Sequence, residues 1–164
     1  MIAREERMAD PSQFEDVDMG MLAEIVAEEL EFAAAKKEIS IHVDVREECF
    51  VRGDQTLFMR FLMNLIQNAI VYGRKGGNVW IRITEEGEKI QGEVRDDGIG
   101  IGEEHLDKIW DRFYRADPSR GKEEGTGLGL SMVKWIAKVH NGEIHVESSL
   151  GKGSRFFFWF PKKR

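Results

Sequence analysis

The sequence predicts an α+β fold, a two-layer α/β sandwich in which a mixed sheet of about five strands packs on three long helices. Three amphipathic segments, residues 19–37, 54–72 and 125–140, have the apolar spacing of long helices. Alternating apolar residues between them are typical of strands, and several of these strands follow one another as hairpins. Because strands do not strictly alternate with helices, a sandwich is favoured over a doubly wound sheet.

Composition narrows the class of protein. A chain of 164 residues suits one domain, and its net charge of -6 argues against nucleic acid as a partner. Cys49 is the only cysteine, so no internal disulfide forms and the cytoplasm is the expected location. The longest apolar run, FFFWF at 156–160, is far too short to span a membrane, and we expect no membrane contact by this domain.

The first half of the chain divides into a tail and a helix–strand–helix series. Residues 1–18 are polar and predict a linker or the end of a preceding helix, so the domain proper is expected at 19–164. Asp18 is placed to cap the helix at 19–37, and the strand at 39–45 is expected to pair with the short segment 49–52.

The second half begins with a helix that Asp54 caps and Gly73 stops. The remaining elements are expected as follows: a hairpin over 78–97, a short helix near 105–113, a long helix ending near His140, a turn at Asn141 and Gly142, and strands at 143–148 and 154–160.

Two amides stand out in NLIQNA, residues 64–69. On a helical wheel Asn68 falls inside the apolar face between Leu57 and Phe61, and Asn64 lies at the edge of the same stripe. A core asparagine bonded to backbone groups is the structural interpretation. The functional one is a Mg²⁺ ligand, since an amide oxygen serves when water and phosphates complete the octahedron. The pair leaves both open.

A carboxylate ends the strand before DDGIGIG, residues 96–102. The period of two places Asp96 on the side of the strand that faces the core, where it needs a hydrogen-bond donor. A plain Asp-Gly turn is the simpler interpretation. Gly98 and Gly100 nevertheless leave room beside the carboxylate for a flat ligand, and an amino-bearing heterocycle such as adenine would be a suitable donor.

Two further stretches follow. In IWDRFYRAD, Trp110 and Phe113 are expected to pack on the core, while Arg115 is free to reach a phosphate. GTGLGL at 125–130 is either a flexible hinge or bare backbone N–H groups at a helix start, which favour a polyphosphate. It matches neither the P-loop nor the dinucleotide-binding pattern, because Leu130 stands where the latter needs glycine.

Taken in order, NLIQNA, DDGIGI, WDRFYR and GTGLGL resemble the N, G1, F and G2 boxes of the ATP-binding catalytic domain of sensor histidine kinases, whose Bergerat-type fold is shared with gyrase, Hsp90 and MutL ATPases. The resemblance covers about residues 19–161, including the closing segments HNGEIHVES and GKGSRFFFWFP. Each motif alone is weak evidence for this family, but four motifs in the right order and spacing are a strong match.

The resemblance implies ATP and Mg²⁺ as cofactors. Asn68 would ligate Mg²⁺ and act in catalysis with Arg115, which would touch phosphate; Asp96 would accept the adenine amino group. Residues 114–126 would form a mobile lid. The full set expected to contact nucleotide or metal is Asn64, Asn68, Tyr72, Asp96, Gly98, Gly100, Ile101, Tyr114, Arg115, Lys122, Gly125, Thr126, Gly127, Leu128, Gly129 and Leu130.

Two positions qualify the resemblance. Family members often have lysine where this chain has Val71, so Arg74, Arg120 or Lys122 would have to supply a phosphate contact. The ATP-hydrolysing relatives have a glutamate base where this chain has Asn64, which favours kinase over hydrolase.

No histidine here has the neighbours of the family's phosphoacceptor. The implied partners are therefore a dimerisation and phosphoacceptor helical hairpin elsewhere in a parent kinase, and a response regulator reached through that parent. We expect an isolated monomer that does not phosphorylate itself. Two alternatives stay open: a stand-alone protein-serine kinase of the anti-sigma-factor type, and an ATP-binding or docking module without transfer, for which Val71 is the only support.

Overall fold

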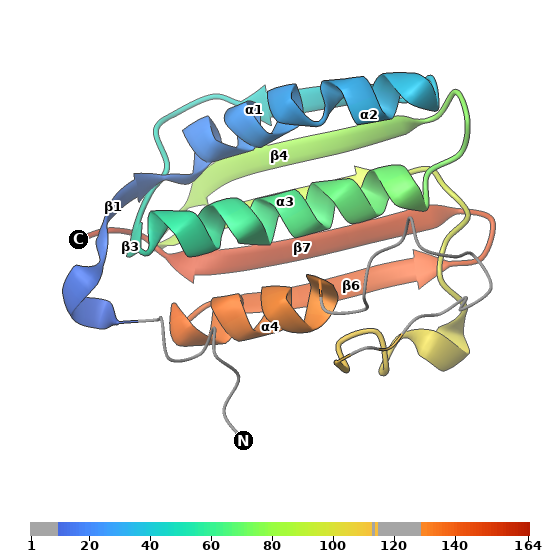
Figure 1. Cartoon of the computed structure of the whole chain (residues 1–164). Coiled ribbons are helices and arrows are strands. Elements are labelled where there is room, and N and C mark those ends of the chain that lie inside the picture. The colour runs from blue at the N-terminus through green and yellow to red at the C-terminus, as the bar shows by residue number, and fades with distance from the viewer. Residues whose placement is uncertain (1–9, 113, 115–128) are drawn as a thin grey trace.

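The computed structural model describes residues 10–112, 114 and 129–164. Its main feature is a five-stranded mixed sheet with one helical layer on one face (Figure 1). The strand order is β2-β4-β5-β7-β6, and β2–β4 is the parallel pair. The strands are β2 (Ser40–Val45), β4 (Asn78–Glu86), β5 (Lys89–Asp96), β6 (Glu143–Ser149) and β7 (Gly153–Pro161).

The helical layer consists of α1 (Met19–Glu29), α2 (Glu31–Lys36), α3 (Gln55–Val71) and α4 (Gly129–Val139). α3 runs across the middle of the sheet, between α1 and α4 (Figure 1). This architecture confirms the predicted α+β two-layer sandwich and its mixed sheet.

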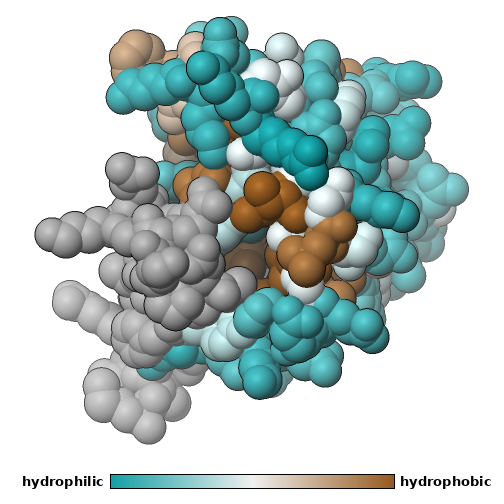
Figure 2. Space-filling model, turned by 90° about the vertical axis from the view of Figure 1, so that its right-hand side faces the viewer, coloured by the Kyte–Doolittle hydropathy of each residue, from teal (hydrophilic) through white to brown (hydrophobic). Residues whose placement is uncertain are grey.

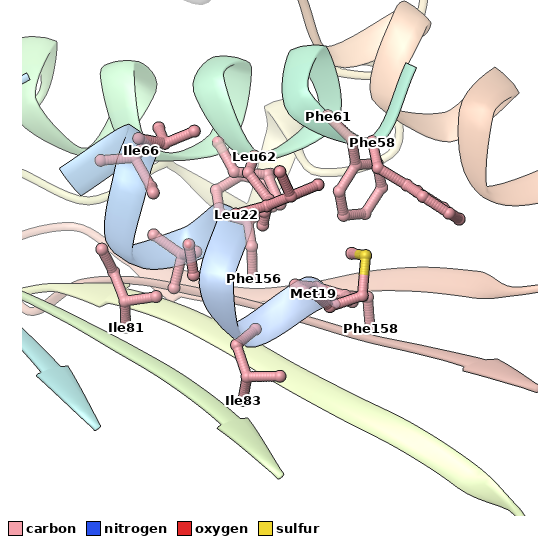
Figure 3. Packing of buried hydrophobic residues seen from close by; sticks show 14 of the residues in the cluster. Met19, Leu22, Phe58, Phe61, Leu62, Ile66, Ile81, Ile83, Phe156 and Phe158 are labelled. Carbon is pink, nitrogen blue, oxygen red and sulfur yellow. The ribbon is translucent and has the colours of Figure 1, made fainter. Parts of the chain in front are cut away.

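The core lies between the two layers. Side chains of α1 and α3, among them Leu22, Phe58 and Leu62, point toward apolar side chains of the sheet such as Ile81 and Phe156 (Figure 3). All five are buried. Alternate residues of each strand therefore face the helices, as a period of two requires.

Local sequence signals set the helix boundaries. The Asp18 carboxylate accepts hydrogen bonds from the N–H groups of Gly20 and Met21, and the Asp54 carboxylate accepts one from Leu57 at the start of α3. Both predicted caps are confirmed. The segment expected as one helix over 19–37 is interrupted at Leu30, which separates α1 from α2.

Three details differ from expectation. Residues 15–18, expected in the linker, form strand β1 (Glu15–Asp18), and its antiparallel partner is β3 (Phe50–Gly53). The expected pairing of 49–52 with the strand at 39–45 was therefore wrong: β3 pairs with β1 in a separate two-stranded sheet, where Val17 and Val51 are partners and both are buried. The short helix expected near 105–113 is, as far as residue 112, a 3₁₀ turn at Glu103–His105 followed by further turns.

Among the residues that the structure describes, no helix combines the length and the apolar character needed to cross a membrane.

Candidate functional site

The predicted site residues that the structure describes belong to elements that meet at one end of the sandwich, where α3 ends, β5 ends and the β6–β7 turn and the start of α4 lie nearby (Figure 1). Figure 2 shows this end in space-filling form, with apolar surface beside a hollow and polar residues above, below and to the right of it. Ile99 and Leu150 are both exposed here although they are large and apolar. Their backbones are joined, because the N–H of Gly151 donates to the carbonyl of Ile99 at 2.8 Å.

Three predicted residues share one side of α3. Asn64, Asn68 and Tyr72 are each four residues apart, so their side chains stack along the helix. The Asn64 amide nitrogen donates to the carbonyl of Gly129, the first residue of α4, at 3.2 Å. Within the described residues the half-buried amide of Asn68 has no hydrogen-bond partner. A half-buried amide without a protein partner suits a ligand site better than a core position.

Asp96 lies at the inner end of β5, where it is 5% exposed. One carboxylate oxygen accepts the N–H of Gly98 at 2.9 Å. Burial raises the pKa of Asp96 to about 6, although the backbone N–H groups of Gly98 and Ser154 favour the ionised form. The neighbouring carboxylate of Asp97 also accepts two hydrogen bonds, from the backbone and the side chain of Asn78, but it is only half-buried. Because an ionised carboxylate can accept about four hydrogen bonds, Asp96 has acceptor sites beyond its two backbone donors, and it has them in a nearly dry position.

The loop after Asp96 passes too close to its neighbours for side chains. A Cβ at Gly98 would collide with the carbonyl oxygen of Tyr72, and one at Gly100 would collide with that of Ser149. Gly100 also has a φ of +76°, which L-residues rarely adopt. The two glycines predicted to shape a base pocket are therefore required by the close approach of this loop to α3 and β6.

The same loop is tied to the β6–β7 turn by residues that the sequence did not reveal. The N–H of Ile101 donates to the Ser148 hydroxyl at 2.7 Å. The Arg74 guanidinium donates to the carbonyls of Gly98 and Gly151, at 3.4 and 3.0 Å. Arg74, considered in the sequence as a phosphate contact, is therefore engaged beside the Asp96 loop. Nothing in the sequence around Arg74, which follows the end of α3, indicates that its side chain binds these distant carbonyls.

Residues predicted near the lid divide into described and undescribed ones. The hydroxyl of Tyr114 pairs with Nδ1 of His105, and Ile101 and Leu130 pack half-buried against the core. Trp110 packs edge-on against Phe156, as expected. Phe113, Arg115, Arg120, Lys122, Gly125, Thr126, Gly127 and Leu128 lie outside the described residues, as does most of the predicted lid at 114–126.

Gly129, which opens α4, is in a different situation from the other predicted glycines. A Cβ there would come no closer than 3.7 Å to Asn64, an ordinary contact. Packing among the described residues thus gives no reason for a glycine at this position. A bare helix start facing the α3 amides is the kind of site that accepts phosphate groups.

Together, a buried carboxylate, a glycine loop, a pair of amides and a helix start define a nucleotide-binding α+β domain. The chain belongs to the family of histidine kinase-, DNA gyrase B- and HSP90-like ATPases, whose profile matches residues 53–164. Within that family it has the ATP-binding catalytic domain of sensor histidine kinases, as its relatives and structural neighbours show.

Curated relatives include the sensor histidine kinase YclK of Bacillus subtilis, 34% identical over 148 residues (89% of this chain and 31% of that protein). The sensor-like histidine kinase SenX3 of Mycobacterium bovis is 37% identical over 147 residues, which are 89% of this chain and 36% of that one. The chain thus spans about a third of the length of these relatives.

Solved structures agree. The nucleotide-free catalytic domain of histidine kinase ThkA has a TM-score of 0.80 at 30% identity, covering 92% of this chain and 96% of that one. A complex of ThkA with the response regulator protein TrrA matches with a TM-score of 0.75 at 28% identity, covering 92% of this chain and 42% of the matched chain.

Proposed function

We propose that this domain binds ATP together with Mg²⁺ and, within a longer sensor kinase, supplies the γ-phosphoryl group to a histidine on a separate dimerisation domain. The observation that carries the proposal is the buried Asp96 carboxylate, which has acceptor sites beyond its backbone bonds and ends β5 beside the C-terminal end of α3, the helix that bears the two amides. A nucleotide needs an acceptor such as this carboxylate where its base amino group binds, and polar groups such as these amides where its triphosphate binds.

At the base end, Asp96 accepts the adenine amino group. Gly98 and Gly100 let the following loop pass close to the end of α3 and to β6, where side chains would collide, and half-buried Ile101 supplies an apolar surface for the ring. The ionised carboxylate is an acceptor only, so a nucleobase with a carbonyl at that position is disfavoured. This selects adenine over guanine.

At the phosphate end, Asn68 fits a Mg²⁺ ion, because its amide has no partner among the described residues and an amide oxygen is an acceptable ligand. Phosphates and water would complete the coordination, and the ion would neutralise charge on the transferred group. Asn64 uses its nitrogen on Gly129, which leaves its oxygen for a water or a phosphate-bound group. Arg115 and Lys122 are proposed as phosphate contacts from their sequence positions alone.

The proposed partners are those of a catalytic domain acting within a larger protein. They are a dimerisation and phosphoacceptor hairpin, and a response regulator, for which the ThkA–TrrA complex is a structural precedent. A cytoplasmic location and a monomeric state in isolation belong to the same proposal.

Calorimetry with ATP and GTP, with and without Mg²⁺, tests the binding site. Asn68→Asp is expected to abolish the gain in ATP affinity that Mg²⁺ provides, and Asp96→Asn to reduce the preference for ATP over GTP. Asn141→Asp and Asp107→Asn make the same chemical changes at exposed positions and should bind like the wild type. Wild-type behaviour of the Asn68 and Asp96 variants would refute the site.

Transfer needs its own experiment. The domain is mixed with the cognate acceptor hairpin and labelled ATP, and an acid-labile label on the hairpin's histidine is expected. An acid-stable phosphoprotein would indicate the serine-kinase alternative, and ATP binding without any labelling would indicate a binding module.

A further inference from the structure

The last carbonyls of α3 lack the N–H partners that a continuing helix would supply, as at every helix C-terminus, and that of Ile70 accepts the Gly73 N–H of the turn that follows. Lys37, which directly follows α2, places its ammonium among them. Its Nζ donates to the carbonyls of Ile70 at 3.0 Å, Val71 at 2.9 Å and Gly73 at 3.0 Å. An ammonium has three N–H donors, so these three carbonyls can accept all the hydrogen bonds that the half-buried Lys37 side chain can donate.

This helix end is also a wall of the proposed base site. The Tyr72 carbonyl, between the Val71 and Gly73 carbonyls that Lys37 binds, accepts the N–H of Ile99 at 3.1 Å. Gly98 packs so closely on Tyr72 and Gly73 that a Cβ would collide with them.

The contacts then reach the acceptor itself, because the N–H of Gly98 donates to the Asp96 carboxylate at 2.9 Å. An unbroken series of hydrogen bonds and backbone contacts therefore joins the ammonium to the carboxylate. It runs through the last turn of α3 and the loop that Ile99 anchors.

We propose that Lys37 is a positioning residue for nucleotide binding, one that holds the end of α3 and thereby the Asp96 loop without touching the ligand. The inference rests on the proposed function, in which Asp96 recognises the adenine. A cation at a helix C-terminus is favoured by the helix dipole and by the bonds to the last carbonyls. Without it the last turn of α3 loosens, and the Gly98 and Ile99 contacts that orient Asp96 loosen with it.

The neighbouring lysine provides a matched control. Lys36 is exposed and its ammonium lies over the Phe32 ring, 4.8 Å from the ring centre, on the outside of α2. Lys36→Met and Lys37→Met each remove one positive charge from adjacent positions. Of the two, only Lys37→Met breaks the hydrogen bonds to the end of α3. A difference between them cannot come from net charge.

The test measures ATP binding by calorimetry and hydrogen–deuterium exchange by mass spectrometry, in the intact chain at a temperature where each variant is folded. In Lys37→Met the Kd for ATP is expected to rise about tenfold, within the usual range for coupled sites. Exchange should speed up in the peptide covering residues 96–101 but not in the one covering 50–57, at the other end of α3. Lys36→Met should match the wild type in both measurements.

The outcomes separate the inference from its premise. A wild-type chain that does not bind ATP refutes the proposed function. A Lys37→Met chain that binds ATP within twofold of the wild type overturns the positioning role even if it is less stable, and so does an equal loss in Lys36→Met. If Lys37→Met does not fold, Lys37→Arg replaces it: a planar guanidinium keeps the charge but cannot aim at these three carbonyls together. Its Kd should rise at least about threefold, and wild-type affinity would overturn the proposal.

Discussion

The buried carboxylate of Asp96 should make the unliganded protein less stable at neutral pH, and Asp96→Asn should remove that effect. Burial raises the pKa of Asp96 from 3.8 to about 6 in the folded chain. The difference of 2.2 pH units corresponds to about 3 kcal/mol of unfavourable free energy above pH 6, at about 1.4 kcal/mol per unit. The sign follows from the proton count, since between these two pKa values the folded state binds the proton more readily than the unfolded one.

The penalty is therefore complete above pH 6 and declines as the pH falls through 6 toward 3.8. From the linkage between proton binding and folding, this destabilisation is about 3 kcal/mol at pH 7.5 and roughly half as large at pH 5. The amide of Asp96→Asn does not titrate, so its advantage over the wild type should shrink by about 1.5 kcal/mol between these two pH values. Any fixed loss, such as a weaker bond from the Ser154 N–H, cancels in this comparison.

Urea unfolding of both proteins at both pH values measures the difference. Asp107→Asn, which alters an exposed carboxylate, provides the control and should track the wild type at each pH. Identical pH dependence of the wild type and Asp96→Asn would show that the carboxylate is not held in a desolvated position, and the argument for a ligand-ready acceptor would fail with it.

Three further predictions concern single residues. His140 donates from Nδ1 to the Ile136 carbonyl and accepts the Asp54 N–H at Nε2, and burial lowers its pKa. The stability of the fold should therefore fall as the pH drops below about 6.5, because the unfolded chain then takes up a proton that the folded chain resists. The urea midpoint of His140→Gln should lack this dependence on acid pH. Glu38 has a φ of +57°, and within the described residues its carboxylate forms one exposed ion pair, with Lys75; Glu38→Gly should therefore raise stability by about 1 kcal/mol in thermal unfolding, and a loss of stability would contradict the backbone strain. Gly129→Ala has room for its methyl group and should keep or raise the melting temperature while weakening ATP binding in calorimetry; unchanged affinity would mean that phosphate does not approach this backbone.

Features with local causes could be predicted from the sequence. The limits of α3 follow from the Asp54 cap and a long apolar stripe, and the inward direction of Asp96 follows from the period of two along β5. Both signals lie within a few residues of the feature that they predict. The α3 amides and the glycines around 98–100 could be recognised for the same reason.

Features that depend on distant parts of the chain could not. A four-residue strand such as β3 has no sequence signal for its partner, and it pairs with β1 rather than with its neighbour β2. The bonds from Lys37 and Arg74 to backbone carbonyls join segments 24 to 77 residues apart. Any carbonyl can accept such a bond, so no residue type identifies the acceptor.

The small β1–β3 sheet determines where this domain can be cut. A boundary drawn at residue 19, where the helical pattern begins, would delete the strand that covers Val51 and the aspartate that caps α1. It would also delete Asp16, the ion-pair partner of Lys163 at 2.8 Å, and so weaken the attachment of the C-terminal tail, which at Lys163 would keep the backbone bond to Phe50. For excision, domain swapping or fusion to another sensor, the usable junction therefore lies before residue 15, upstream of the first apolar periodicity.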